Sequence, residues 1–144
     1  MLADNVFLTQ TDTTIGFISQ SESRLTLIKQ RPPYKHYIRA VNSLETLKTF
    51  TRVPQRHKKR VRRAVRTTFI MPSGDSFRVI QDTHHLLLLD RLKWAYTTSA
   101  NLSGEVYRED FAKEKCDIIV TPLQGNTHPS AILQLGHQRV KRIR

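Results

Sequence analysis

The sequence is poor in the residues that build disulfides, metal centres and nucleotide fingerprints. Cys116 is the only cysteine in 144 residues, which excludes an internal disulfide, makes structural zinc improbable and favours a reducing, cytoplasmic setting. The neighbours His84 and His85 point to different faces of a helix or strand, which argues against a metal site. Neither a Gly-rich dinucleotide fingerprint nor a Gly-Lys-Ser/Thr phosphate loop occurs.

Long apolar runs and acidic residues are scarce as well. No run approaches the roughly 18 apolar residues of a membrane helix, and residues 1–5 do not begin a signal peptide. No repeat, low-complexity tract or linker interrupts residues 1–144, so one α/β domain is expected. With 12 Asp+Glu against 24 Lys+Arg, the net charge is +12. A charge this positive predicts attraction to a polyanion, either nucleic acid or an anionic membrane surface.

The positive charge is densest between residues 56 and 66. If this run is helical, Val61 and Val65 face inward and the arginines face outward. A solvated surface is the simpler explanation, but like charges packed this closely repel one another unless an anion offsets them. The run is therefore a candidate RNA-binding surface made of Arg56, Lys58, Lys59, Arg60, Arg62, Arg63 and Arg66.

Two polar loops follow predicted strands. Residues 97–104 read Thr-Thr-Ser-Ala-Asn-Leu-Ser-Gly, after an apolar helix over 86–94 and a short strand at 95–98. Residues 9–14 carry four threonines and Asp12 after a strand that begins at Val6. Hydroxyl, amide and backbone N–H groups after a strand can bind phosphate oxygens. Turns that satisfy their own backbone, and threonines that only favour strands, are the simpler alternatives.

The other segments predict mixed helices and strands. Ser43 has the pattern of a helix N-cap, and the residue before Pro32 should end an element. The predicted elements are a helix over 24–31, a strand over 34–41, a helix over 44–50, a hairpin of 67–72 with 77–80, a helix over 105–115, a buried strand over 117–120 and a loop over 125–130.

The polar segments occur in the order found in the YrdC-like family of threonylcarbamoyl-AMP synthases, which the chain resembles. Residues 11–16 are similar to that family's Pro-Thr-Asp-Thr-Val-Tyr-Gly signature, and 29–32 to its Lys-x-Arg-Pro segment. Residues 98–104 match its Ser-Ala-Asn-x-Ser-Gly loop, and 129–132 resemble its Pro-Ser-Thr loop. Residues 68–72 resemble the end of its Trp-Pro-Gly-Pro-x-Thr strand, and 77–79 its Val-Arg-x-Pro strand.

The resemblance implies a single YrdC-like α/β domain, with a twisted mixed β-sheet, flanking helices and a basic concave face. It implies that L-threonine, bicarbonate or carbon dioxide and ATP are joined into threonylcarbamoyl-AMP for the threonylcarbamoyladenosine modification of tRNA. Mg²⁺ would accompany the nucleotide, and no protein-ligated metal is expected. The implied macromolecular partners are tRNA or double-stranded RNA and a downstream threonylcarbamoyl transferase machinery, with no membrane partner.

The same resemblance implies a role for individual residues. Lys29 and Arg31 would be catalytic, by neutralising the triphosphate or the substrate carboxylate. The threonine-binding residues would be Thr11, Thr68, Arg78, Thr97 and Ser130. The nucleotide-binding residues would be Lys35, Ser99, Asn101 and Arg142.

The chain departs from the family pattern at several positions. Gln10 and Ile15 replace a usual proline and tyrosine, and residues 63–66 read Arg-Ala-Val-Arg where Trp-Pro-Gly-Pro is common. These arginines alter one wall of the expected pocket and add positive charge beside it. A second hypothesis follows, in which the chain is a non-catalytic or weakly catalytic module that binds double-stranded or structured RNA.

Overall fold

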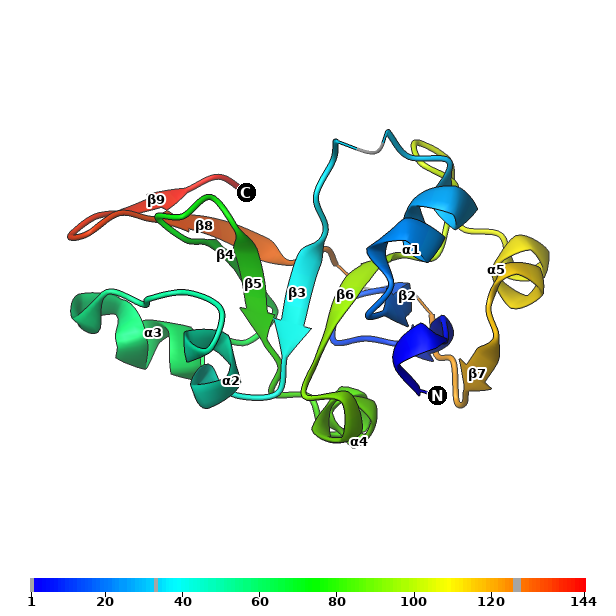
Figure 1. Ribbon diagram of the computed structural model, residues 1–144, viewed down its shortest axis with the longest axis horizontal. Helices are drawn as coiled ribbons and strands as arrows, with labels where there is room; N and C mark the ends of the chain where they lie inside the picture. Colours follow the sequence, from blue (N-terminus) through cyan, green and yellow to red (C-terminus); the bar gives the residue numbers. More distant parts are fainter. Residues whose placement is uncertain (1, 33, 126–127) are drawn as a thin grey trace.

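The computed structural model describes residues 2–32, 34–125 and 128–144. Across these residues nine strands form one mixed sheet in the order β7-β1-β2-β6-β3-β5-β4-β8-β9, which twists across the molecule in Figure 1. This architecture confirms the predicted mixed α/β fold. The strands are β1 (Phe7–Gln10), β2 (Ile15–Ser19), β3 (Ile38–Val41), β4 (Thr67–Ile70), β5 (Ser76–Val79), β6 (Trp94–Ser99), β7 (Ile118–Val120), β8 (Ala131–Leu135) and β9 (Val140–Arg142).

Short helices flank the sheet in three places. Figure 1 shows α1 and α5 beside the end of the sheet that holds β2 and β7, and α2 and α3 near β5. Helix α4 lies below β3 and β6 in this view and contacts both β6 and β1. No helix in the described ranges is long and apolar enough to cross a bilayer. The helices are η1 (Leu2–Asp4), α1 (Glu22–Lys29), α2 (Leu44–Lys48), η2 (Gln55–His57), α3 (Lys58–Arg63), α4 (Thr83–Leu92) and α5 (Glu109–Lys115).

Local signals explain where the helices begin and end. The Ser43 side chain accepts from Thr46 N at the start of α2, as predicted, and Asp82 caps α4 by accepting from His85 N. Because of this cap, α4 begins at Thr83, earlier than the apolar run suggested. α1 ends at Lys29, where Gln30 adopts the left-handed conformation with φ 52° and turns the chain.

Strand pairing brings the polar loops together. β6 lies antiparallel to both β2 and β3, so that Gly16 is opposite Ser99 and Ile38 is opposite Thr97. A Cβ on Gly16 would lie 2.9 Å from the Thr98 carbonyl oxygen and 3.0 Å from Thr11 Cγ2. Glycine is therefore required by the close approach of the two strands at this point.

Several expectations need correction. α3 ends at Arg63, so Val61 is fully buried as predicted but Val65 is 63% exposed. The strand at 118–120 was predicted to be buried. It is instead an edge strand, with Ile118 and Ile119 38% and 40% exposed, because β1 is its only neighbour in the described part of the sheet. β3 begins at residue 38 rather than 34. Residue 33 and part of the predicted 125–130 loop, residues 126 and 127, lie outside the described residues.

One cation is embedded among aromatic rings between the sheet and α2. The Arg39 guanidinium carbon lies 5.1 Å from the ring centroid of Phe50, 5.8 Å from that of Phe77, 6.0 Å from that of Trp94 and 5.2 Å from that of Tyr96. Its Nη2 also donates to the Tyr96 hydroxyl at 3.2 Å. The positive charge is attracted to these ring faces, so Arg39 ties β3 to β5, β6 and the end of α2.

Replacing this cation should destabilise the fold. We expect Arg39→Leu to lower the free energy of unfolding by about 1 to 2 kcal/mol, because the stem is retained but the cation–π attraction is lost. Urea unfolding followed by tryptophan fluorescence measures the change. Arg91→Leu, at an exposed position of α4, is the control and should cost less than about 0.5 kcal/mol. Equal losses in the two variants would contradict this reading of the aromatic cluster.

Candidate functional site

A cavity of about 360 Å³ lies where β2, β3 and β8 begin and β6 ends. Seven separate segments of the chain contribute to its wall. The lining combines three arginines with hydroxyl side chains, and it includes no carboxylate from the described residues. The lining residues are Thr13, Thr14, Arg31, His36, Tyr37, Ile38, Arg78, Thr97, Thr98, Ser99, Pro129, Ser130 and Arg144.

Thr11 shapes the loop that runs from β1 to this cavity, which we call the anion cavity. Its hydroxyl oxygen accepts from the backbone N–H of Thr13 at 3.2 Å and of Thr14 at 3.0 Å. The same hydroxyl donates to the Thr14 carbonyl at 2.6 Å. Thr11 therefore lies behind the wall and closes the turn, while Thr13 and Thr14 line the cavity.

Arg31 reaches the cavity from the turn after α1. Its Nη2 donates to the His36 carbonyl at 2.8 Å, and its guanidinium carbon lies 4.5 Å from the centroid of the Tyr37 ring. These two contacts hold a half-buried cation against the cavity wall. Five donors on one guanidinium leave capacity for an anion beyond the single bond to His36.

The C-terminal arginine and Ser130 form a second cationic corner. Arg144 Nε donates to the Ser130 carbonyl at 2.9 Å, and Arg144 Nη2 donates to the Ser130 hydroxyl at 3.3 Å. The buried hydroxyls of Ser130 and Thr68 are 2.8 Å apart and hydrogen-bonded. Thr68 thus lies behind Ser130 and fixes its hydroxyl, although Thr68 does not itself line the cavity.

Arg78 is the most deeply placed of the three arginines. Its side chain is 6% exposed, and its Nε lies 3.3 Å from Oδ1 of Asp12, whose side chain is 5% exposed. Nδ1 of the fully buried His85 lies 4.0 Å from the same carboxylate oxygen. Burial raises the pKa of Asp12, with Arg78 opposing the shift, and burial lowers the pKa of Arg78, with Asp12 opposing it. Burial and the Arg78 charge lower the pKa of His85 to about 3, so the ring is neutral at neutral pH.

Lys29 is buried next to the cavity but does not line it. Its ammonium donates to the Ser99 carbonyl at 2.8 Å, to the Asn101 carbonyl at 2.8 Å and to Asn101 Oδ1 at 3.2 Å. Burial, and then the nearby charge of Arg31, lower the pKa of Lys29 to about 8. All three donors are used, so Lys29 fixes the 99–101 loop in this state.

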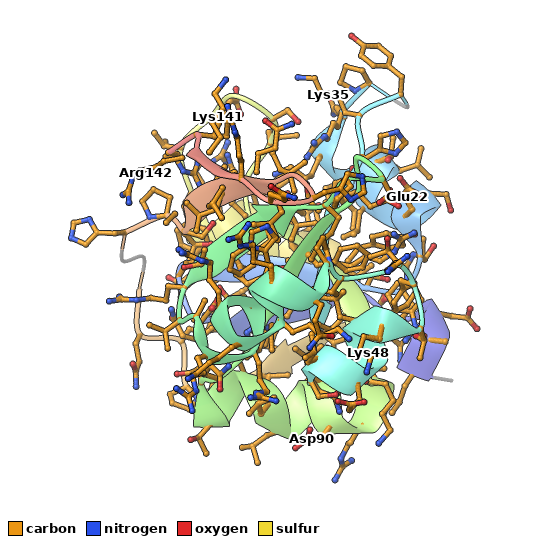
Figure 2. The ribbon with its side chains drawn as sticks, turned by 90° about the vertical axis from the view of Figure 1, so that its left-hand side faces the viewer. Glu22, Lys35, Lys48, Asp90, Lys141 and Arg142 are labelled. Carbon is orange, nitrogen blue, oxygen red and sulfur yellow. The ribbon has the colours of Figure 1, made fainter. Side chains whose placement is uncertain are left out.

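The structure brings together only part of the set of residues expected from sequence. Lys29, Asn101, Thr11 and Thr68 lie behind the wall. Lys35 lies outside, on the loop before β3, and Arg142 projects from β9, as Figure 2 shows. Their roles stay predictions. The expected residues that line the cavity are Arg31, Arg78, Thr97, Ser99 and Ser130.

Sequence reasoning missed several residues of the cavity and its support. Arg144 lines it where Arg142 was expected, and the basic tail offers no signal that separates these two arginines. Asp12 was visible in its motif, but nothing linked it to Arg78 or to His85, which comes from α4. Tyr37 and Thr98 are further lining residues that were not expected.

The basic run from Arg56 to Arg66 is placed away from the anion cavity. Six of its seven cations are exposed, Lys58 is half-buried, and none forms an ion pair with a described acidic residue. Arg56 borders a separate, larger cavity of about 760 Å³, together with Arg52 and His137. Arg66 instead borders two smaller depressions beside Asp12. The run therefore covers α3 and its flanks and contributes no residue to the anion cavity.

The donor set of the anion cavity is suited to anions. Arginines and hydroxyls bind carboxylate and phosphate oxygens, whereas Mg²⁺ requires oxygen ligands that are usually carboxylates or phosphates. Within the described ranges, no group of three His, Cys, Asp or Glu residues is arranged to hold a metal ion.

The chain is similar in sequence to longer proteins of Mycoplasma. It is 31% identical over 146 residues to the uncharacterized protein MG259 of Mycoplasma genitalium, and 29% identical over 143 residues to the MG259 homolog of Mycoplasma pneumoniae. These alignments cover 94% and 92% of this chain but 31% and 30% of the two relatives. The chain thus spans about a third of the length of its relatives. No family model matches it.

Solved structures share the fold at low sequence identity. A P. abyssi Sua5 variant superposes with a TM-score of 0.81 at 20% identity, covering 98% of this chain and 49% of Sua5. P. abyssi Sua5 complexed with L-threonine gives 0.79 at 19% identity, covering 98% of this chain and 50% of Sua5. E. coli YciO gives 0.73 at 19% identity, covering 98% of this chain and 82% of YciO. The chain has the Sua5 and YciO fold.

The buried neutral histidine predicts acid sensitivity. The unfolded chain binds a proton at His85 near pH 6.5, whereas the folded protein does so only near pH 3. The stability contributed by neutral His85 is therefore present above pH 6.5 and is lost as the pH falls toward 3. Between about pH 7.5 and about pH 5.5 this group should lower the free energy of unfolding by about 1.4 kcal/mol.

Urea unfolding of the native protein and of His85→Phe at both pH values measures this contribution. The pH-dependent loss should be smaller in His85→Phe by that amount. His137→Phe, which removes an exposed ring, should keep the native difference. The same pH difference in all three proteins would refute the assignment.

Proposed function

We propose that the anion cavity binds L-threonine and the phosphates of ATP. The protein then forms threonylcarbamoyl-AMP from L-threonine, bicarbonate or carbon dioxide and ATP. This product would supply the threonylcarbamoyladenosine modification of tRNA. One observation carries the proposal: Arg31, Arg78 and Arg144 converge with six Ser and Thr hydroxyls on one cavity. The shared fold with P. abyssi Sua5, a structure complexed with L-threonine, supports the choice of substrate.

The proposed reaction needs charge neutralisation more than a protein nucleophile. The carbamate formed on the threonine nitrogen attacks the α-phosphate through its oxygen, and the bond from the α-phosphate to the leaving pyrophosphate breaks. Both reactants are anionic, so cations fixed before binding stabilise their approach and the charge that develops during transfer. The arginines that line the cavity supply that charge, and hydroxyls from the β1–β2 loop and β6 supply directional hydrogen bonds.

The depth of each group favours one orientation of the substrates. Arg78, Thr97 and Ser130 are each at most 5% exposed and form the base of the cavity, which suits the compact threonine. Arg31 and the exposed Arg144 are nearer the opening and suit phosphates. A volume of about 360 Å³ is at the lower end for small-molecule sites, so the adenosine would extend outward past exposed Ser99. Lys29 would act by holding the loop that carries Ser99.

Synthesis is tested with ATP labelled on the α-phosphate, in the presence of threonine, bicarbonate and Mg²⁺. The expected result is labelled threonylcarbamoyl-AMP and pyrophosphate that require threonine. Arg144→Ala should lower kcat/KM by about 10- to 100-fold, because charge-assisted hydrogen bonds to phosphate are lost. Arg142→Ala should change it less than about twofold if the lining arginine, rather than its neighbour on β9, binds the phosphates.

Arg91→Ala on α4 is the control for loss of a surface charge. A folded native protein that makes no product would refute the synthase. An equal loss in the Arg142 and Arg144 variants would refute the assignment of the phosphate contact to Arg144.

A second function, RNA binding, is favoured by the exposed charge on α3. Arg60, Arg62 and Arg63 are exposed and have no acidic partner among the described residues. Like charges at this spacing repel one another, and RNA phosphates would relieve that repulsion. Because this surface shares no residue with the anion cavity, RNA binding and synthesis are compatible and can be tested separately.

Duplex RNA labelled with a fluorophore tests this surface by anisotropy over a range of salt concentrations. We expect affinity to fall steeply with salt, and the double variant Arg60→Gln/Arg63→Gln to weaken binding and reduce the salt slope by about one unit per lost phosphate contact. Arg91→Gln should bind as the native protein does. Adenylate synthesis should be unchanged in the double variant. Salt-independent binding, or equal weakening by Arg91→Gln, would exclude α3 as the RNA-binding surface.

A further inference from the structure

We propose that Asp12 is a positioning residue for Arg78, and that the His85 ring shields their ion pair from water. The Arg78 guanidinium then presents its terminal N–H groups to the carboxylate of the amino-acid substrate. The identity of that substrate rests on the proposed function. The positioning role rests on the geometry of the buried cluster.

Arg78 lies on a buried face of the sheet that is apolar where α4 packs and that also carries the buried Thr97. In the strand register Arg78 is opposite Ala40, which is opposite Ala95. Directly paired residues share a face, and Ala40 and Ala95 pack in one cluster with Leu88 and Leu89 of α4. A guanidinium beneath this layer is costly unless a carboxylate compensates its charge. Asp12, with Oδ1 at 3.3 Å from Nε, is that carboxylate.

The ion pair engages only one end of the guanidinium. The contact at Nε is a charge contact without hydrogen-bond geometry, and no hydrogen bond to a described residue occupies the two terminal nitrogens of Arg78. Arg78 also lines the anion cavity, so its terminal N–H groups are available on that side. A guanidinium held at Nε and open at its terminal nitrogens is oriented for a bidentate contact with a carboxylate.

His85 contributes as a neutral wall. Its ring is fully buried in the first turn of α4, and neither ring nitrogen has a hydrogen-bond partner among the described residues. A neutral ring does not compete with Arg78 for Asp12, and it keeps solvent from the pair. Asp82 and Arg66 also act on the Asp12 carboxylate, but both act less strongly than Arg78 does, and neither lines the anion cavity.

Hydrogen exchange at the arginine Nε–H groups tests the positioning role without any assay of activity. In protein labelled with ¹⁵N-arginine, the Arg78 Nε–H resonance is identified by its loss in Arg78→Lys. It should exchange at least about tenfold more slowly than that of exposed Arg142 in the native protein. Equal rates would overturn the proposal, and both rates are measured on the native protein.

Variants of the cluster separate charge from shape. Asp12→Asn keeps the size of the side chain but removes its charge, and should accelerate Arg78 exchange by about tenfold. His85→Ala should also accelerate it by admitting water, whereas His85→Phe should preserve slow exchange. Asp90→Asn is the control, because Asp90 is exposed on α4 and takes no part in the ion pairs of Asp12. Unchanged exchange in Asp12→Asn would overturn the role of Asp12, and accelerated exchange in His85→Phe would overturn the shielding role.

Kinetics then test the link to substrate. In the synthesis assay, Asp12→Asn should raise KM for threonine by about tenfold or more while KM for ATP changes less than about twofold. A parallel rise in both KM values would show a general structural defect and overturn the proposal. If the native protein makes no threonylcarbamoyl-AMP, the proposed function fails, and the exchange experiment alone decides whether Asp12 positions Arg78.

Discussion

The ion pair of Arg78 and Asp12 is the interaction on which the cavity depends. It places a cation with 6% of its side chain exposed under a layer of apolar residues, in a chain whose net charge is already +12. Removing either partner would leave an uncompensated buried charge, which is among the most destabilising changes a core can undergo. The pair and the His85 ring together join three elements. Arg78 comes from β5, Asp12 from the β1–β2 loop and His85 from α4. The same contact therefore stabilises the fold and aligns a cavity arginine.

The other cavity groups are fixed by similarly local constraints. Gly16 allows β2 to approach β6 at a distance that leaves no room for a Cβ, which brings the threonine loop beside residues 97–99. Lys29 uses its full set of donors on the 99–101 loop, and Thr68 orients Ser130 beneath Arg144. Ser99, Ser130 and Arg78 are thus each supported by a buried partner behind the wall. Such support reduces the reorganisation needed when an anionic substrate binds.

The sequence predicted the features that depend on local order. Ser43 as a cap, the hairpin of residues 67–80 and the mixed α/β fold are confirmed, because capping and turn chemistry act over a few residues. The prediction that Val65 faces inward was wrong, because it extended the helical periodicity beyond Arg63, where α3 ends. Arg142 was expected at the site, whereas Arg144 lines the cavity, because the placement of the two arginines depends on the register of β9 against β8. The contact of Asp12 with Arg78 depends on tertiary folding and has no short-range signal.

The distribution of charge separates what the two surfaces can do. In and behind the cavity wall, each cation has a defined contact. Arg78 pairs with Asp12, and Lys29 donates to three oxygens of the 99–101 loop. Arg31 and Arg144 each donate to a backbone carbonyl. Their directions are set, so they suit a small ligand that must be held in one orientation. The exposed cations of α3 have no such partners among the described residues, and their long side chains remain free to follow a phosphate backbone. Fixed cations favour catalysis through orientation, whereas solvated cations favour salt-dependent binding of a polyanion. The cations of α3 contribute no residue to the anion cavity, so substitutions on this helix should leave the chemistry of the cavity intact.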